Sequence, residues 1–394
     1  MQLVLFDLPS SHSQLLPLTY TRPIADLRIG IYTIADKWSL HLNTPYTFLT
    51  QDYLQKKFSQ ISAPDEKLYI NGAVLPNKEL IKQIKSLKKE KALFHKETII
   101  AYKSDHTLTA SELLSLKKES EVTEPINTID RPWNLFQLNG QEIKADFSLA
   151  TEKRTSSPLT DKHTICYNEK DIFIEEGVSI KASVLDATRG PIYIDKHAII
   201  SIGAVIEGPT AIGKHATIKS GAKIRAGSTI GTYSKIGGEV SNVIIQGYSN
   251  KGHDGFLGNA VIGEWCNLGA DTNASNMKNN YSIAKAWDYK SHSFISTGIQ
   301  FCGLLMGDHS KAGINTMFNT ATMVGICSNI FGSDFPEKFI PSFSWGSKGD
   351  MTTFRLEKVF EMAENMMARK NISFSDDDKK IISHVFNITS PYRK

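Results

Sequence analysis

The chain has 394 residues, enough for two or three domains of the usual ~100–200 residues each. Its 41% hydrophobic and 22% charged residues are ordinary for a globular protein. A formal net charge of +4 is too small to predict a nucleic-acid partner, and no apolar run approaches the ~20 residues that span a bilayer. No segment resembles a signal peptide, so we expect a cytoplasmic protein without membrane partners.

The cysteines are few and widely spaced, with no Cys-x-x-Cys pair. This spacing predicts neither a zinc site nor a disulfide framework, and it suits a reduced compartment. The four residues are Cys166, Cys266, Cys302 and Cys327.

Residues 1–150 alternate apolar runs with helical stretches, which predicts an α/β domain of Rossmann type. The lysine-rich stretch Lys82–Lys96 is typical of the solvated face of a helix rather than of a binding patch. The predicted strands are Gln2–Phe6, Tyr46–Thr50, Leu68–Ile70 and Thr98–Tyr102. The predicted helices are Ile29–Leu42, Asn77–Lys89 and Ser111–Lys118.

An isoleucine then recurs every six residues, a period that neither a helix nor an ordinary strand requires. Such a hexad describes a triangular coil in which each face is a short strand and each corner a tight turn. The isoleucines stack inward, so the pattern predicts a parallel β-helix. They are Ile194, Ile200, Ile206, Ile212, Ile218, Ile224, Ile230 and Ile236.

A small residue follows each of the first seven isoleucines by four positions, where a turn leaves little room. Glycines at several corners supply unusual backbone angles. The periodicity does not define the hand of the coil. The small residues are Ala198, Ala204, Thr210, Ala216, Ala222, Ser228 and Ser234.

The repeat is irregular outside this run. Coils begin at Ile174 and Ile180, a loop is predicted over Ser241–Gly255, and coils resume at Ile262 in a register shifted by two. An amphipathic helix is expected near Thr353–Arg369. The predicted divisions are an α/β domain at 1–150, a linker at 151–171, a solenoid at 172–332 and a C-terminal extension at 333–394.

The interruption contains the densest polar chemistry, around His253. Transfer of an acyl group to an amine requires a base, and histidine is suitable because its pKa lies near neutral pH. An uninterrupted rod would favour a structural or adhesive role, whereas this break favours an enzyme. The alternative is that His253 is an ordinary surface histidine.

The run from Gly252 to Ala270 resembles the acetyltransferase half of the bifunctional N-acetylglucosamine-1-phosphate uridylyltransferase/glucosamine-1-phosphate acetyltransferase family. The hexad likewise resembles that of hexapeptide acyltransferases, which implies a left-handed β-helix and a homotrimer. Gly307–Asn315 resembles a coil of archaeal-type sugar-phosphate transferases of the same build.

The resemblance implies roles for individual residues. His253 would be the general base, with Asn267 and Asn276 orienting the acetyl group and sugar and Arg225 holding a phosphate. Lys311, with backbone amides around Gly307 and Gly313, would meet the phosphates of acetyl-CoA. Three departures stand out: Phe256 replaces a tyrosine, Ser241 replaces a lysine, and only Lys278 or Lys285 replaces a later lysine of the family.

Three N-terminal segments resemble sugar-1-phosphate nucleotidylyltransferases. They are Leu16–Pro23, Asn71–Ala73 and Arg131–Phe136. The chemistry of that family is incomplete here, because no glycine-rich loop follows Asp7, Ile24 replaces a lysine and Ala73 replaces a metal-binding aspartate.

Arg22 and Lys37 are the candidate nucleotide-binding residues, near Asp26 and Arg28, although all four equally suit surface or salt-bridge positions. No metal site is predicted, and Mg²⁺ is expected only if this half is active.

We therefore expect an acetyl-CoA-dependent acetyltransferase acting on an amino-sugar phosphate or sugar nucleotide, in UDP-N-acetylglucosamine biosynthesis. Its N-terminal half is expected to be a degenerate sugar-1-phosphate nucleotidylyltransferase. One alternative is a working nucleotidylyltransferase with a trimerising solenoid. Another is a non-catalytic protein that binds sugar nucleotides.

Overall fold

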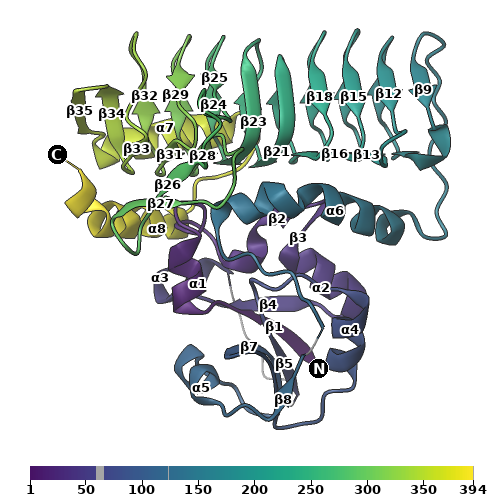
Figure 1. The fold of residues 1–394 in the computed structure, drawn as a ribbon, viewed down its shortest axis with the longest axis vertical. Helices are drawn as coiled ribbons and strands as arrows, with labels where there is room; N and C mark the ends of the chain where they lie inside the picture. Colours follow the sequence, from purple (N-terminus) through teal and green to yellow (C-terminus); the bar gives the residue numbers. More distant parts are fainter. Residues whose placement is uncertain (59–65, 123, 394) are drawn as a thin grey trace. The chain divides into compact units, whose positions relative to one another are not determined.

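The structure is a computed structural model that describes residues 1–58, 66–122 and 124–393 (Figure 1). Its contacts divide the chain into two compact units. The first contains Met1–Leu15, Thr21–Arg28 and Tyr32–Arg131, and the second contains the remaining segments through Lys394. Within the described residues, no helix combines the length and apolar character needed to cross a membrane.

The first unit contains the predicted α/β sheet, with strand order β4-β1-β5-β7-β6-β8. The central strand β1 is apolar and buried, and it pairs in parallel with both β4 and β5. The strands are β1 (Gln2–Phe6), β4 (Tyr46–Leu49), β5 (Lys67–Asn71), β6 (Lys91–His95), β7 (Thr98–Ser104) and β8 (Ser120–Glu121). The helices are α1 (Pro9–Gln14), α2 (Ile34–Leu42), α3 (Asp52–Phe58), α4 (Lys78–Lys85) and α5 (Ala110–Ser115), with η1 at Ile24–Asp26. A short hairpin follows η1, formed by β2 (Arg28–Ile29) and β3 (Tyr32–Thr33).

The prediction of one helical face over Lys82–Lys96 was wrong. Helix α4 ends at Lys85 and strand β6 begins at Lys91. Glu90 turns the chain between them with a φ of 55°, and its carboxylate accepts a hydrogen bond from the Ser104 hydroxyl at 2.8 Å. The apolar residues of β6 form a short, buried run, Ala92–Phe94, which suits a strand and which the neighbouring lysines obscured.

The division of contacts falls at Arg131–Pro132, whereas the sequence suggested a boundary at residue 150. Helix α6 (Pro132–Thr151) packs on strands of the second unit. The buried Asn139 amide donates to the carbonyl oxygen of Gly227 at 2.7 Å and to the Thr229 hydroxyl at 3.0 Å. The first solenoid strand, β9, already lies within the predicted linker 151–171.

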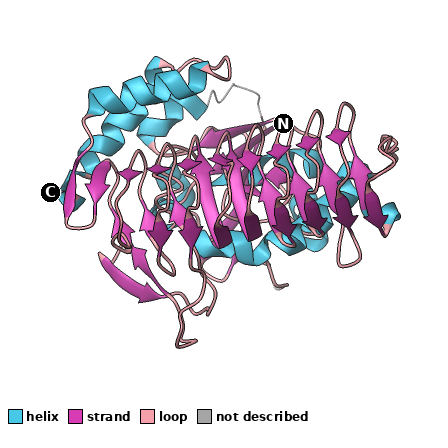
Figure 2. Ribbon diagram, turned by 90° about the horizontal axis from the view of Figure 1, so that it is seen from above, coloured by secondary structure: helices cyan, strands magenta, loops and turns pink. Residues whose placement is uncertain are grey.

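The second unit is a parallel β-solenoid with three faces, here named A, B and C (Figure 2). Faces A and B form one 15-stranded sheet, because the long strands β21 (Glu239–Gly247) and β23 (Phe256–Glu264) run through the corner between them.

Each face is a stack of short strands. Face A contains β10 (Ile172–Ile174), β13 (Ile192–Ile194), β16 (Thr210–Ile212), β19 (Ser228–Ile230), β28 (Leu305–Met306), β31 (Met323–Val324) and β33 (Phe339–Ile340). Face B contains β9 (Ile165–Tyr167), β12 (Val184–Asp186), β15 (Val205–Glu207), β18 (Lys223–Arg225), β25 (Asn273–Ala274) and β30 (Met317–Phe318). Face C contains β11 (Ser179–Ile180), β14 (Ile199–Ile200), β17 (Thr217–Ile218), β20 (Lys235–Ile236), β22 (Asn250–Lys251), β24 (Asn267–Leu268), β29 (Lys311–Ala312), β32 (Asn329–Ile330), β34 (Ser344–Ser347) and β35 (Asp350–Thr353).

The predicted isoleucine ladder is confirmed. All eight isoleucines and all seven small corner residues have 0% exposure. Ile200 pairs with Ile218 on face C, so one coil takes 218 − 200 = 18 residues. The ladder therefore forms the core of the prism, while the left hand of the coil stays a prediction.

The predicted loop over Ser241–Gly255 was wrong, because this segment forms a shortened coil with strands β21 and β22. Ile236 pairs with Lys251, a separation of 251 − 236 = 15 residues. The corner before β21 is short, and Gly238 adopts a φ of +67° there. A Cβ on Gly238 would lie 2.6 Å from the carbonyl oxygen of Gly255, so the glycine lets the following loop approach.

The solenoid also continues beyond residue 332, through β33 and β34, and β35 then pairs antiparallel with β34. Two helices follow, α7 (Leu356–Ala368) and α8 (Asp376–Ile388), with η3 at Ser390–Tyr392. Helix α7 matches the predicted amphipathic helix, with Val359, Ala363 and Met367 buried. A hairpin of β26 (Lys285–Asp288) and β27 (Ser293–Ser296) leaves the coil between β25 and β28.

Candidate active site

A row of polar side chains follows the outer surface of face C. Backbone pairing aligns Lys235 with Asn250, Asn250 with Asn267, and Asn267 with Lys311. Each of these residues directly precedes an inward-facing residue of the ladder, so each faces outward because side chains alternate along a strand. Adjacent strands lie ~4.8 Å apart, so the row is a closely spaced polar ladder.

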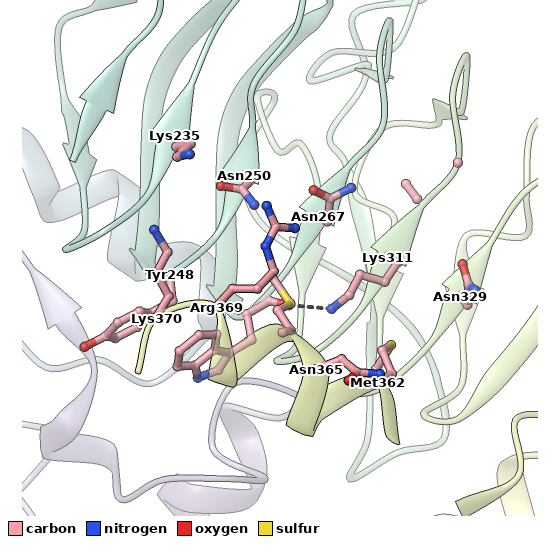
Figure 3. Close-up of a pocket in the computed structure, with 14 residues that line it drawn as sticks. Lys235, Tyr248, Asn250, Asn267, Lys311, Asn329, Met362, Asn365, Arg369 and Lys370 are labelled. Carbon is pink, nitrogen blue, oxygen red and sulfur yellow. Dashed lines mark hydrogen bonds between the residues drawn. The ribbon is translucent and has the colours of Figure 1, made fainter. Parts of the chain in front are cut away.

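Helix α7 lies opposite this row (Figure 3). Between them is a cavity of about 750 Å³, lined from face C by Lys235, Asn250, Asn267 and Lys311 and from the helix side by Asn365, Met366, Arg369 and Lys370. A neighbouring cavity of about 420 Å³ shares Lys235, Asn250, Asn267 and Arg369 with it. We name the two cavities together the basic groove.

The groove contains His253. This exposed side chain follows β22 at the corner between faces C and B, and it lines the smaller cavity with Lys219, Lys235 and Asn267. The structure thus brings together two of the residues predicted for catalysis, His253 and Asn267.

The loop that carries His253 is attached to a buried lysine. Lys251 occupies the ladder position that follows Ile236, and it is 2% exposed. Its Nζ donates to the carbonyl oxygens of His253 and Asp254, each at 3.1 Å. Burial lowers the pKa of Lys251 to about 8. An apolar ladder position therefore carries a cation that binds the backbone of the histidine loop.

The other predicted substrate residues lie outside this groove. Arg225, on face B, forms ion pairs with Glu207 and Glu239, which raise the pKa of its guanidinium. The Asn276 amide donates to the Asn259 side chain at 2.8 Å. In the described chain neither residue lines the groove with His253.

Lys278 and Lys285 lie around the excursion that follows β25. The Lys278 Nζ donates to the carbonyl oxygen of Ile283 at 2.9 Å. Lys285 begins β26, and its carbonyl oxygen accepts a hydrogen bond from the Lys338 Nζ at 2.9 Å. Their role as phosphate ligands stays a prediction.

The predicted coenzyme residues are mostly engaged within the solenoid. The amide of Gly307 donates to Val324 and that of Gly313 donates to Ile330. Lys311 lines the groove, but its Nζ donates to the carbonyl oxygens of Trp265 and, at 3.0 Å, His309. Burial lowers the pKa of Lys311 to about 8. Because its Nζ is bound to backbone carbonyl oxygens, Lys311 is less available to a phosphate than the other cations of the groove.

Those other cations were not found from the sequence. Lys219 and Lys235 could have been identified, because each directly precedes or follows a ladder residue on face C. Arg369 and Lys370 gave no such signal, since they reach the groove only through the packing of the helical segment on the solenoid.

In the first unit, the predicted nucleotide residues Arg22 and Lys37 are both buried, with 5% and 1% exposure. The Arg22 guanidinium lies 3.4 Å from the Asp26 carboxylate. Asp7, at the carboxyl end of β1, accepts hydrogen bonds from the Ile24 amide at 3.1 Å and the Thr50 hydroxyl at 2.6 Å. Burial raises the pKa of Asp7 to about 7. Strands β4 and β5 pair in parallel with β1 on its two sides, and open α/β sheets bind ligands beyond the carboxyl ends of such strands.

This edge does not present the donor set that Mg²⁺ prefers. Each carboxylate oxygen of Asp7 already accepts a hydrogen bond, and Ala73, just beyond the neighbouring strand β5, has no side-chain ligand atom. Across the described ranges, no three His, Cys, Asp or Glu side chains gather as metal ligands would.

The chain thus combines an α/β unit with a parallel β-solenoid that carries the basic groove. Residues 3–155 match the family model described as "Sugar nucleotidyl transferase". This match identifies the N-terminal region as similar to sugar nucleotidyl transferases, and it spans less than half of the chain. No curated protein sequence matches the chain.

Solved structures share weaker similarity with the chain. UDP-N-acetylglucosamine acyltransferase from Campylobacter jejuni has 15% identity and a TM-score of 0.28, over 57% of this chain and 88% of that one. The Arabidopsis UDP-N-acetylglucosamine acyltransferase has 14% identity and a TM-score of 0.26, over 59% and 81%. A mutant of AntD, an N-acyltransferase from Bacillus cereus in complex with dTDP and coenzyme A, has 11% identity and a TM-score of 0.21, over 55% and 100%. Similarity at this level defines neither substrate nor activity.

Proposed function

We propose that the basic groove is the site of an acyltransferase that moves an acetyl group from acetyl-CoA to the amine of a sugar phosphate or sugar nucleotide. The observation that supports this most is the single cavity shared by His253, Asn267 and the cations Lys219, Lys235 and Arg369. The cations suit phosphorylated ligands, and the histidine suits proton transfer.

Acetyl-CoA supplies a thioester whose carbonyl carbon accepts the amine. His253 would take a proton from the attacking amine, as the C–N bond forms and the C–S bond breaks. It would then return that proton to the leaving sulfur, so the histidine ends the cycle neutral. The Asn267 amide would donate to the thioester oxygen as negative charge develops there.

The experiment measures coenzyme A release from acetyl-CoA with a panel of amino-sugar phosphates and amino-sugar nucleotides. We expect turnover by the wild type and a loss of about 10²–10⁴-fold in His253→Ala. Wild-type turnover that survives this substitution would exclude His253 as the base. An absence of wild-type turnover across the panel would contradict the proposed function.

A second candidate function rests on the family-model match over residues 3–155. We propose that the first unit binds a sugar nucleotide, with Arg22 and Lys37 as its cations. Pyrophosphate release from nucleoside triphosphates and sugar 1-phosphates, with and without Mg²⁺, tests whether it also catalyses transfer. Cytoplasmic location and a homotrimer remain predictions, and light scattering of the purified protein tests the latter.

A further inference from the structure

The charges that line the basic groove have one sign. None of the described residues that line its two cavities is an aspartate or glutamate, whereas Lys219, Lys235, Lys311, Arg369 and Lys370 all line it. Like charges repel, and this repulsion is stronger where protein excludes water. The arrangement therefore favours an anionic occupant.

Three of these cations lie close together. Burial lowers the pKa of Lys370, and the neighbouring charges of Lys235 and Arg369 lower it further. The Lys370 ammonium also lies 5.2 Å from the centre of the Tyr233 ring. Lys235 comes from face C and Arg369 follows α7, so the cluster joins two elements of the second unit (Figure 3).

A third cavity provides an internal comparison. It measures about 570 Å³ and continues along α7, sharing Met362 and Asn365 with the larger cavity. There the cation Lys358 is paired with Glu361 at 2.6 Å. The third cavity therefore has Glu361 beside its two cations, Arg355 and Lys358, whereas the charged residues that line the basic groove are all cations.

We propose that Lys235, Arg369 and Lys370 form a binding site for a diphosphate group, which the C-terminal helical segment completes within a single chain. Arginine binds phosphate oxygens in a planar, two-pronged geometry, and lysines add compact charge. The amides of Asn250 and Asn267 on the opposite wall supply further donors. The ligand class is a diphosphate ester, as found in both coenzyme A and nucleoside diphosphate sugars.

This inference goes beyond the proposed function, because diphosphate binding requires no acyl transfer. A wild type that binds diphosphates without turnover would keep the inference and lose the proposed function. The residues proposed here to bind the diphosphate differ from the phosphate-binding residues that the sequence suggested.

The test is calorimetric titration of the full chain with pyrophosphate, ADP, UDP and coenzyme A at low salt. We expect the double variant Arg369→Gln/Lys370→Gln to raise Kd about tenfold to a hundredfold. The matched control is Lys380→Gln, an exposed lysine of α8 outside the groove. Stronger wild-type binding of coenzyme A than of UDP would identify the coenzyme as the source, and the reverse would identify the sugar nucleotide.

The first unit is a second candidate nucleotide site, so only binding that is lost in the groove variants is evidence for the proposed diphosphate site. If the double variant is misfolded by circular dichroism, Lys235→Gln on the separate strand β20 replaces it with the same expectation. Undiminished binding in these variants, or wild-type protein that binds none of the four probes, would overturn the proposal.

Discussion

At the scale of single residues, two buried charges occupy places where apolar or neutral groups are usual. Asp7 lies at the end of the central strand of the first unit, and Lys251 lies in the aliphatic ladder of the solenoid. Each is held by hydrogen bonds. Burial raises the pKa of Asp7 and lowers that of Lys251, and both shifts favour the neutral form of the group. Charges kept in such positions have measurable consequences for stability and for the histidine loop.

The raised pKa of Asp7 gives a signed dependence of stability on pH. Its folded pKa of about 7 exceeds the ordinary aspartate pKa of 3.8, so between these values the folded state binds a proton that the unfolded state lacks. Stability from this group therefore rises as pH falls from 8 to 5.5, by roughly 1.4 kcal/mol for each unit of pKa difference crossed. As pH falls over this range, we expect the free energy of unfolding of the wild type to rise relative to that of Asp7→Asn. A difference between the two proteins that does not change with pH would contradict the assignment.

Lys251 is expected to position the histidine loop at a cost in stability. Lys251→Met restores an apolar ladder residue, so we expect equal or higher Tm, because burying a charge is costly. The loop loses two hydrogen bonds, so hydrogen exchange at His253 and Asp254 should accelerate and turnover should fall about tenfold. The control is Ile236→Met, at the same ladder position one coil earlier. It should change neither the hydrogen exchange of the loop nor turnover. Unaltered exchange in Lys251→Met would show that the lysine does not hold the loop.

At the scale of elements, the solenoid was predictable because its period is imposed by packing. From Ile194 to Ile236 the inward position repeats at six-residue spacing, so one apolar pattern specifies strand, corner and core together. The α/β strands β1, β4, β5 and β7 were also predictable from their apolar runs. Strand β6 was missed because flanking lysines suggested a helix.

Helix α8 was missed although its start has a sequence signal. Ser375 and Asp378 form a capping box, and both hydrogen bonds are present. The basic groove was only half predictable. His253 and Asn267 stand out in the sequence, whereas Arg369 and Lys370 depend on how the helical segment packs on face C, which no local pattern encodes.

The ladder predicts a steep difference between neighbouring positions of one strand. Ile218 in β17 has 0% exposure, and Ile218→Ala should destabilise the protein by about 2–5 kcal/mol through the cavity that it leaves. Thr217 precedes it on the outer surface, and Thr217→Ala should lower the free energy of unfolding by less than about 1 kcal/mol. Urea unfolding followed by circular dichroism measures both. Equal effects would contradict the inward placement of the isoleucines.

At the scale of the whole molecule, the chain supplies both walls of its groove. The face C wall carries His253, and the helical segment carries Arg369. The proposed acyl transfer would take place in the solenoid unit, and the proposed sugar-nucleotide binding in the α/β unit of the same polypeptide.

This arrangement predicts that mixed variants do not complement each other. His253→Ala and Arg369→Gln remove parts of the same groove, so a mixture prepared by co-expression should show no more turnover than the separate proteins. Subunits that exchange their helical segments would instead create some intact grooves. Restored coenzyme A release in the mixture would therefore contradict a site completed within one chain.

The acyl-transfer site is proposed to be the basic groove on face C, and not the surroundings of Asn276, whose amide binds the Asn259 side chain. Two asparagines provide a matched test, because Asn267 lines the groove with His253 and Asn276 does not. The measurement is kcat/KM for coenzyme A release by Asn267→Ala and Asn276→Ala. We predict a fall of about tenfold or more for Asn267→Ala and little change for Asn276→Ala. The opposite pattern would contradict this location of the site.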